Sequence, residues 1–196
     1  KIKRLYKRII CRGKRVIKIV KNFLPYPLFK QLLGVVESQN VDWHWQPQSI
    51  HYGPTGGDGK WMFVNVIKDG TITSKELMPL FSVFKDFQDE HYKGDTILKM
   101  KLNLNPNQGT PIEFGLHTDI IPPDPDVITS VFNFHTCNGY TKILSPDKPE
   151  TLVPSIANSI VIFDNPLPHA GVSQTDIDRR IVLNMNVQRT IEDDNI

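Results

Sequence analysis

The sequence predicts a mainly β domain with flanking helices, built as a barrel-like sandwich. Three segments, at residues 96–106, 127–134 and 180–188, alternate apolar and polar side chains with the period of two that is typical of strands. Two earlier segments, near residues 29–36 and 74–92, carry apolar side chains at helical spacing. A chain of 196 residues is long enough to bury one full core without disulfides. We therefore expect a single β-rich domain whose two helices buttress one face of a sheet.

A basic arm, residues 1–15, precedes this domain, which we expect to span residues 16–196. Residues 1–21 hold ten of the 23 Lys and Arg and no acid, which leaves 13 basic and 21 acidic residues and a formal charge of −8 in the remainder. Such an arm can bind nucleic acid or another anionic partner through its charge. A solvated terminus that aids solubility fits the same pattern, so both interpretations stay open. At its end, Val16 to Val20 predicts an edge strand whose lysines protect it from wrong pairing.

Both helices are expected to present an apolar stripe to the core. The first follows two prolines at residues 25–27 and ends near Gln39. In the second, Thr73 and Glu76 resemble a capping box, and Pro79 either kinks the helix or marks its true beginning. The stripes consist of Phe29, Leu32, Leu33 and Val36 in the first helix, and of Leu77, Leu80, Phe81, Phe84 and Phe87 in the second.

Between the helices, residues 41–59 combine aromatic side chains and histidines with four glycines. This composition fits a mobile substrate-binding flap at the mouth of a site. It fits a plain hairpin with partly buried tryptophans equally well. His44 and His51 show no ligand spacing, so we leave them out of any metal site.

The three alternating strands place their polar side chains on one face. These are Lys99, Lys101, Asn103 and Asn105 in the first strand, Thr129 and Asn133 in the second, and Arg180, Asn184 and Asn186 in the third. The opposite faces carry Leu98, Met100, Leu102 and Leu104, then Ile128, Phe132 and Phe134, then Ile181, Leu183, Met185 and Val187. A sheet with one solvated face gives this pattern. So does a sandwich whose polar faces converge on a hydrated pocket.

Two metal-ligating side chains, His117 and Asp119, lie two residues apart in a segment that reads as a strand, so both should point to the same face. They supply two of the three ligands in the two-histidine, one-carboxylate set that binds non-haem iron. His169 is the candidate third ligand, because it follows the buried strand 160–163 and two proline-containing turns and should open the next strand. Eleven residues later, Arg180 begins a polar face, and its guanidinium can bind a carboxylate through two parallel hydrogen bonds.

This order, His-x-Asp, a strand pair, then His and a basic residue, resembles the iron(II)- and 2-oxoglutarate-dependent dioxygenases. Within them it is most similar to the prolyl-4-hydroxylase-like branch, including the small versions of bacteria and their phages. The resemblance covers residues 96–188, with a looser match from about residue 18. It implies a double-stranded β-helix core of the jelly-roll or cupin-like kind. It also implies iron(II) and 2-oxoglutarate as cofactors, dioxygen as co-substrate and ascorbate as a reductant.

By the same resemblance, His117, Asp119 and His169 would bind iron and Arg180 would pair with the distal carboxylate of 2-oxoglutarate. Arg179 competes for that role, but Arg180 shares strand parity with the asparagines that follow it.

The sequence departs from the family at three places. Asn133 and Asn105 stand near positions where many members have tyrosines that hydrogen-bond 2-oxoglutarate, and amides can do the same work. The segment 138–141 reads as a turn similar to the family's Gly-Gly-x-Thr, without the doubled glycine.

The activity implied is hydroxylation of a C–H bond coupled to the conversion of 2-oxoglutarate to succinate and carbon dioxide. A peptide or protein substrate, hydroxylated at proline, is the default of the branch. A nucleobase or a small metabolite is the alternative within the same chemistry. A hypothesis of a different class is a non-catalytic β-sandwich that binds nucleic acid or virion partners through residues 1–21.

Two cysteines, Cys11 and Cys137, are too few for a disulfide framework and favour a reducing compartment. The sequence has neither an apolar run of membrane-spanning length nor a cleavable signal pattern. We therefore expect no membrane association and a location in the cytoplasm of a bacterium or of a phage-infected host.

Overall fold

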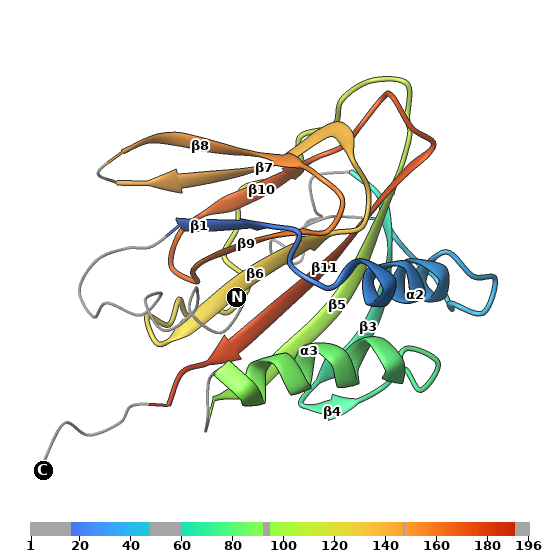
Figure 1. Ribbon diagram of the computed structural model, residues 1–196. Coiled ribbons are helices and arrows are strands. Elements are labelled where there is room, and N and C mark those ends of the chain that lie inside the picture. The colour runs from blue at the N-terminus through green and yellow to red at the C-terminus, as the bar shows by residue number, and fades with distance from the viewer. Residues whose placement is uncertain (1–16, 48–59, 92–94, 147, 191–196) are drawn as a thin grey trace, which may run out of the picture.

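The computed structural model describes residues 17–47, 60–91, 95–146 and 148–190. Strands dominate, as the alternating segments predicted, and they form two antiparallel sheets (Figure 1). The large sheet runs in the order β1 (Ile17–Lys21), β9 (Ser159–Asp164), β6 (Val127–Asn133), β11 (Arg179–Gln188), β5 (Thr96–Pro106), β3 (Met62–Asp69) and β2 (His44–Gln46), with β4 (Thr71–Ile72) beside β3. The small sheet consists of β10 (His169–Val172), β7 (Cys137–Ser145) and β8 (Lys148–Ser155).

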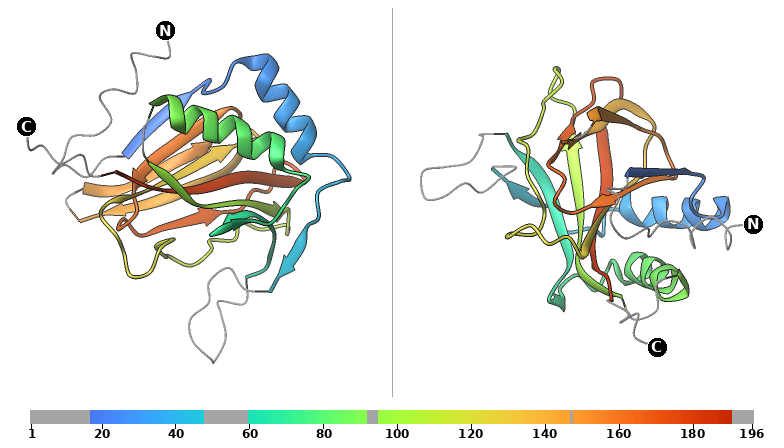
Figure 2. Two further views of the ribbon diagram at one scale, coloured as in Figure 1. Left: turned by 90° about the horizontal axis from the view of Figure 1, so that it is seen from below. Right: turned by 90° about the vertical axis from the view of Figure 1, so that its left-hand side faces the viewer.

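Two helices, α2 (Tyr26–Val36) and α3 (Met78–His91), cover one face of the large sheet, and the small sheet lies over the other face (Figures 1 and 2). The helices share a core with the apolar faces of β5, β6 and β11, in which Phe132 contacts the rings of Phe29 and Phe84. A second, smaller core joins the two sheets and includes Val131 and Val182. The expected buttress of helices on one face of a sheet is therefore confirmed.

Pro79 lies in the first turn of α3, which resolves the two interpretations of this proline in favour of a helix beginning there. The predicted capping box is wrong, because the helix starts two residues after Glu76. The Thr73 hydroxyl instead donates to the carbonyl of Val66, and Glu76 accepts hydrogen bonds from Ser74 and from the Asn65 amide.

The strand predicted over 96–106 has the observed bounds of β5, but its apolar face differs at one position. Ile97 is buried in the core and Leu98 is only partly buried. The ladder between β5 and β11 pairs Lys99 with Asn186 and Ile97 with Val187, so Leu98 is the extra residue of a bulge. A bulge reverses the alternation beyond it, which a strict period of two does not anticipate.

The central pair of strands, β5 and β11, sets the register of the polar face. Arg180 stands opposite Asn105, and Asn184 stands opposite Lys101. Because side chains alternate along a strand, all four lie on the face turned toward the small sheet. The polar faces thus converge between the sheets, as the pocket interpretation expected.

Several expectations fall on residues outside the described ranges: the basic arm 1–15, His51 with the glycines of the aromatic segment, and Cys11. Within the described part, β1 pairs only with β9 and is an edge strand, as expected. The strands β2 and β3 pair antiparallel, as a hairpin would, with Trp45 63% exposed. Among the described residues, no helix has both the length and the apolar character that crossing a membrane requires.

Candidate metal centre and its pocket

The segment that carries His117 and Asp119 is not the regular strand that the sequence suggested. Between β5 and β6 the chain forms a long loop, and His117 joins the small sheet through an isolated antiparallel bridge to His169, the first residue of β10. The bridge is closed by two backbone hydrogen bonds, His117 N to His169 O at 3.0 Å and His169 N to His117 O at 2.9 Å. Prolines at 111, 122 and 123 flank the segment and prevent a continuous ladder. This bridge sets the two imidazoles opposite each other, and a second bridge, between Glu113 and Val172, ties the same segment to β10.

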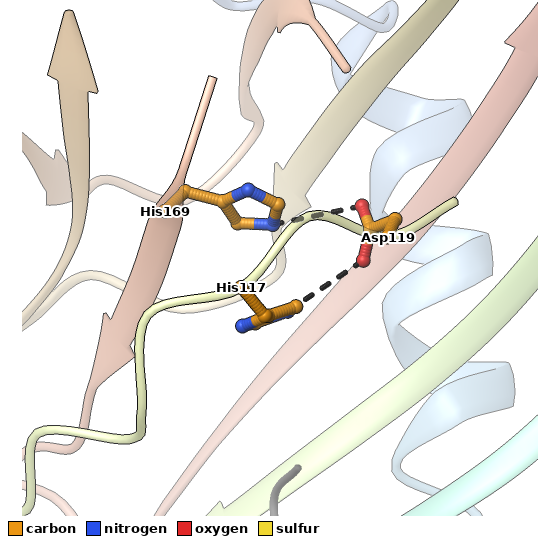
Figure 3. Close-up of side chains that lie close together, drawn as sticks. All are labelled: His117, Asp119 and His169. Carbon is orange, nitrogen blue, oxygen red and sulfur yellow. Dashed lines mark ion pairs between the residues drawn. The ribbon is translucent and has the colours of Figure 1, made fainter. Parts of the chain in front are cut away.

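The three side chains meet at one point between the sheets (Figure 3). His117 Nε2 lies 3.6 Å from Asp119 Oδ1, and His169 Nε2 lies 3.5 Å from Asp119 Oδ2. The potential ligand atoms all lie within 4.8 Å of one another, and the imidazole centroids are 4.5 Å apart. This is the spacing of atoms that can share one metal ion.

Each imidazole is oriented by a backbone carbonyl at its Nδ1. His117 Nδ1 is 3.0 Å from Gly115 O, and His169 Nδ1 is 3.3 Å from Leu167 O. Donation to a carbonyl places the proton on Nδ1 and leaves the Nε2 lone pair free for a metal. Among the described residues, the buried Nε2 of His169 has no hydrogen-bond partner. A buried nitrogen without a partner is costly, and a metal ion at this point would satisfy it.

Asp119 is held by two amides of β11. Asn184 Nδ2 donates to both carboxylate oxygens, at 3.3 and 3.1 Å, and Asn186 Nδ2 donates to Oδ2 at 3.0 Å and also to Thr129 Oγ1 at 3.1 Å. Burial would raise the pKa of the Asp119 carboxyl, but the nearby His117 imidazole, the hydrogen bond from Asn186 and the charge of His169 outweigh it and hold this pKa well below its usual range. Asp119 therefore stays an anion, as a metal ligand must.

The two histidines differ electrostatically in the absence of a metal. Burial lowers the pKa of His169. At His117 burial acts in the same direction, but the nearby Asp119 carboxylate outweighs it, and the pKa of His117 is raised. His117 is therefore the more readily protonated of the two, and a metal would displace that proton.

A cavity opens beside the three residues, and Arg180 lies in its wall. The Arg180 side chain is only 1% exposed, and three of its donors are occupied: Nε donates to Ser155 Oγ at 3.2 Å, and Nη2 donates to Asn133 Oδ1 and Thr141 Oγ1, each at 3.3 Å. The guanidinium has five N–H groups, so the two on Nη1 remain without a partner among the described residues. Nη1 lies on the side of Gly171, another residue of the cavity wall.

Arg179 points away from this cavity. Its side chain is 45% exposed, and Nη2 lies 3.3 Å from Glu37 Oε1. Of the two arginines between which the sequence left a choice, the structure brings only Arg180 to the cavity that holds His117 and His169.

The two predicted asparagines lie in different places. Asn105 is buried in the cavity wall, and its Oδ1 has no hydrogen-bond partner in the described part of the chain. Asn133 instead uses its side chain inside the protein, where Oδ1 accepts from Arg180 and Ser155 and Nδ2 donates to Ser159 Oγ at 3.3 Å. Asn133 therefore positions Arg180, whereas Asn105 faces the space that a ligand would fill.

The sequence missed the role of Gly139. The segment 138–141, expected to be a turn, belongs to β7, where the ladder to β8 shifts register between Cys137 and Tyr140. A Cβ on Gly139 would lie 2.9 Å from the carbonyl oxygen of Val172 and 3.0 Å from Arg180 Cδ. Only glycine leaves room for the Arg180 side chain beside this backbone, and this close approach is visible only in the folded structure.

No protein-family model matches the sequence, and none of the curated proteins compared with it matches either. Solved structures do match. An oxidoreductase of the 2OG-Fe(II) oxygenase family from Burkholderia pseudomallei has a TM-score of 0.69 and 10% identity, over 91% of this chain and 87% of that chain. A Pseudomonas putida prolyl-4-hydroxylase has a TM-score of 0.64 and 13% identity, over 91% and 95%. The non-haem α-ketoglutarate-dependent epimerase SnoN from nogalamycin biosynthesis has a TM-score of 0.64 and 13% identity, over 96% and 83%. At these identities the likeness concerns the fold, and the expected double-stranded β-helix is confirmed.

Proposed function

We propose that this protein is an iron(II)- and 2-oxoglutarate-dependent oxygenase. One observation carries the proposal: His117, Asp119 and His169 converge beside a cavity whose wall contains His117, His169 and the buried Arg180. Two imidazoles and a carboxylate on one side of an ion leave the other coordination positions open. A buried guanidinium with unused donors suits the distal carboxylate of a dicarboxylate ligand. Neighbours of the same fold that are named as 2-oxoglutarate-dependent enzymes support this combination.

The donor set fits ferrous iron. Both imidazoles present Nε2, the carboxylate is ionised, and the orphaned Nε2 of His169 calls for a partner. Imidazole and carboxylate ligands suit a divalent metal of intermediate softness, and the absence of a thiolate from the set disfavours a structural zinc site. His117, Asp119 and His169 would hold the iron.

When bound, iron and 2-oxoglutarate would supply the oxidation, in which dioxygen is consumed, 2-oxoglutarate becomes succinate and carbon dioxide, and a substrate C–H bond becomes C–OH. The protein supplies the geometry. Asn184 and Asn186 hold Asp119 in one orientation, and the backbone bridge holds the two histidines. Arg180 supplies charge for the distal carboxylate through Nη1, and Asn105, which stands opposite Arg180, offers an amide to the cavity.

For the substrate, we propose a peptide or protein, hydroxylated as in the prolyl-4-hydroxylase branch. The Pseudomonas putida neighbour, a prolyl-4-hydroxylase, supports this choice. Leu116 and Ile121, which flank the metal residues in the chain, are 37% and 82% exposed and offer apolar contact to a chain passing the site. The alternative is a small metabolite, which the SnoN neighbour favours, since that enzyme belongs to nogalamycin biosynthesis.

The cofactor claim is tested by anaerobic titration of the protein with iron(II) and 2-oxoglutarate. We expect the weak visible charge-transfer band of the chelate in the wild type and in Arg179→Met, which is the matched control outside the cavity. We expect no band in His169→Ala. A wild type that gives no band, together with salt-sensitive binding of nucleic acid, would replace the oxygenase with the non-catalytic module.

The substrate claim is tested by 2-oxoglutarate turnover. Proline-rich peptides should raise succinate formation above the basal rate, and mass spectrometry should find the peptide heavier by one oxygen. Parallel reactions with single-stranded DNA and RNA test a nucleobase substrate. Stimulation by nucleic acid and none by peptides would overturn the peptide proposal while leaving the cofactor chemistry intact.

A further inference from the structure

A second cation, Lys101, lies in the wall of the cavity and has no part in the function proposed so far. It belongs to β5 and points to the same face as Asn103 and Asn105. Its partner on β11 is Asn184, whereas the partner of Asn105 is Arg180. Lys101 and Arg180 therefore stand on neighbouring strands of one polar face, offset by four residues, or about 13 Å at the usual rise of a strand.

Lys101 is near the metal residues. Asn184, which stands beside it, donates to the Asp119 carboxylate. The charge of Asp119 acts on the Lys101 ammonium, and the charge of Lys101 acts in turn on His117 and on His169. Arg180, in contrast, is anchored toward Ser155 and Thr141 in the small sheet. The cavity thus has one cation at its metal end and another at its far end.

Within the described residues, the Lys101 ammonium has no hydrogen-bond or ion-pair partner. Its neighbour on the same strand, Lys99, lies 3.4 Å from Asp69 Oδ2. Burial lowers the pKa of Lys101, and the charge of Asp119 opposes that effect. Lys101 is half-buried, and an ammonium partly removed from water is less favourable without a partner than when an anion meets it. Lys101 lines the cavity, so an anionic ligand bound there can meet its ammonium.

The dicarboxylate of the proposed function matches the two cations. One carboxylate of 2-oxoglutarate is distal, and the other is adjacent to the 2-oxo group that would lie at the metal. We propose that Lys101 binds this metal-end carboxylate and that Lys101 and Arg180 together select a 2-oxo dicarboxylate, one cation for each end. The inference rests on the proposed function, because its ligand is 2-oxoglutarate.

The test compares two ligands on the Mn(II)-loaded protein by calorimetry, without turnover. 2-Oxobutyrate keeps the metal-end carboxylate and the 2-oxo group of 2-oxoglutarate but lacks the distal carboxylate. Lys101→Met should weaken both ligands by a similar factor, about 10- to 100-fold, the usual range for one charge-assisted contact. Arg180→Met should weaken 2-oxoglutarate alone. Lys99→Met, the matched control on the same strand, should bind both ligands as the wild type does.

The affinity for Mn(II), measured by electron paramagnetic resonance, separates ligand binding from a merely structural role. Removing a positive charge beside Asp119 should leave Mn(II) binding unchanged or tighter in Lys101→Met. Lys101→Arg, which keeps the charge, should recover part of the lost ligand affinity.

If Lys101→Met binds both 2-oxo acids as tightly as the wild type, or loses affinity only for Mn(II), the inference about Lys101 is wrong and the proposed function still stands. If the wild type itself binds no 2-oxoglutarate, the proposed function fails and this inference fails with it.

Discussion

Replacing Arg180 with methionine should weaken 2-oxoglutarate binding while sparing the metal. Methionine keeps much of the apolar stem and removes the guanidinium, whose Nη1 faces the cavity wall at Gly171. A hydrogen bond to a charged group contributes about 1.5–3 kcal/mol, so losing the contact with the distal carboxylate should raise the Kd by about 10- to 150-fold. Little of this contact is screened, because Arg180 is 1% exposed.

The substitution also has a cost within the protein, and the assay must separate the two effects. Ser155 Oγ and Thr141 Oγ1 each lose the hydrogen bond that Arg180 donates to them, whereas Asn133 Oδ1 keeps the one from Ser155. A buried acceptor left without a donor costs about 1–3 kcal/mol. Binding is therefore measured by calorimetry on the Mn(II)-loaded protein at a temperature where circular dichroism shows the variant folded. Arg179→Met, at the neighbouring exposed position, is the control.

A folded Arg180→Met protein with wild-type affinity for 2-oxoglutarate would refute the assignment. In that case the distal carboxylate would bind elsewhere, and the buried guanidinium would serve only to join β11 to the small sheet.

Three further predictions concern the metal and the fold. His169→Ala should weaken Mn(II) or Fe(II) binding by more than about 100-fold, because loss of a hydrogen bond that only supports a ligand already weakens metal binding by about 10- to 100-fold. Near-wild-type affinity in a metal titration would contradict the role of His169 as a ligand. Metal affinity should not change with pH above the pKa of His117, which is raised above the ordinary value of 6.5. Below that pKa it should fall about tenfold per pH unit, because a proton then competes with the metal for Nε2. Metal titrations at a series of pH values from about 5 to 8 would show this decline or its absence. Gly139→Ala should lower the free energy of unfolding, measured in urea, by about 1–3 kcal/mol, because its Cβ would meet Val172 O at 2.9 Å and Arg180 Cδ at 3.0 Å. It should also weaken the binding of 2-oxoglutarate and leave metal affinity unchanged. An unchanged urea midpoint would contradict this prediction and mean that the backbone shifts here at little cost.

Local alternation was enough to predict the central strands. The segment 96–106 became β5 with the expected bounds, because side chains on its two faces meet different surroundings all along its length. The prediction failed at Leu98, where the bulge against β11 gives the core position to Ile97. A bulge depends on how two strands match, and neither strand encodes it alone.

The metal residues show a similar division. The types and spacing of His117, Asp119 and His169 marked them as candidates, although the segment 114–120 is a loop with one bridging residue and not the strand that was expected. Parity along β11 favoured Arg180 over Arg179, and the structure turns only Arg180 toward the cavity.

By itself the sequence determined which chemical groups are present and which of them share a face of a strand, because these properties depend on residue type and on a period of two. Only the tertiary structure decided which faces meet. It joined His117 to His169 by a backbone bridge across 52 positions of the chain, and it placed the amides of Asn184 and Asn186 on Asp119. It also placed Lys101 in the wall of the cavity that His117, His169 and Arg180 line, without a partner in the described part of the chain. The physical reason is that hydrogen bonds and charges act over a few ångströms in space, whatever the separation along the chain.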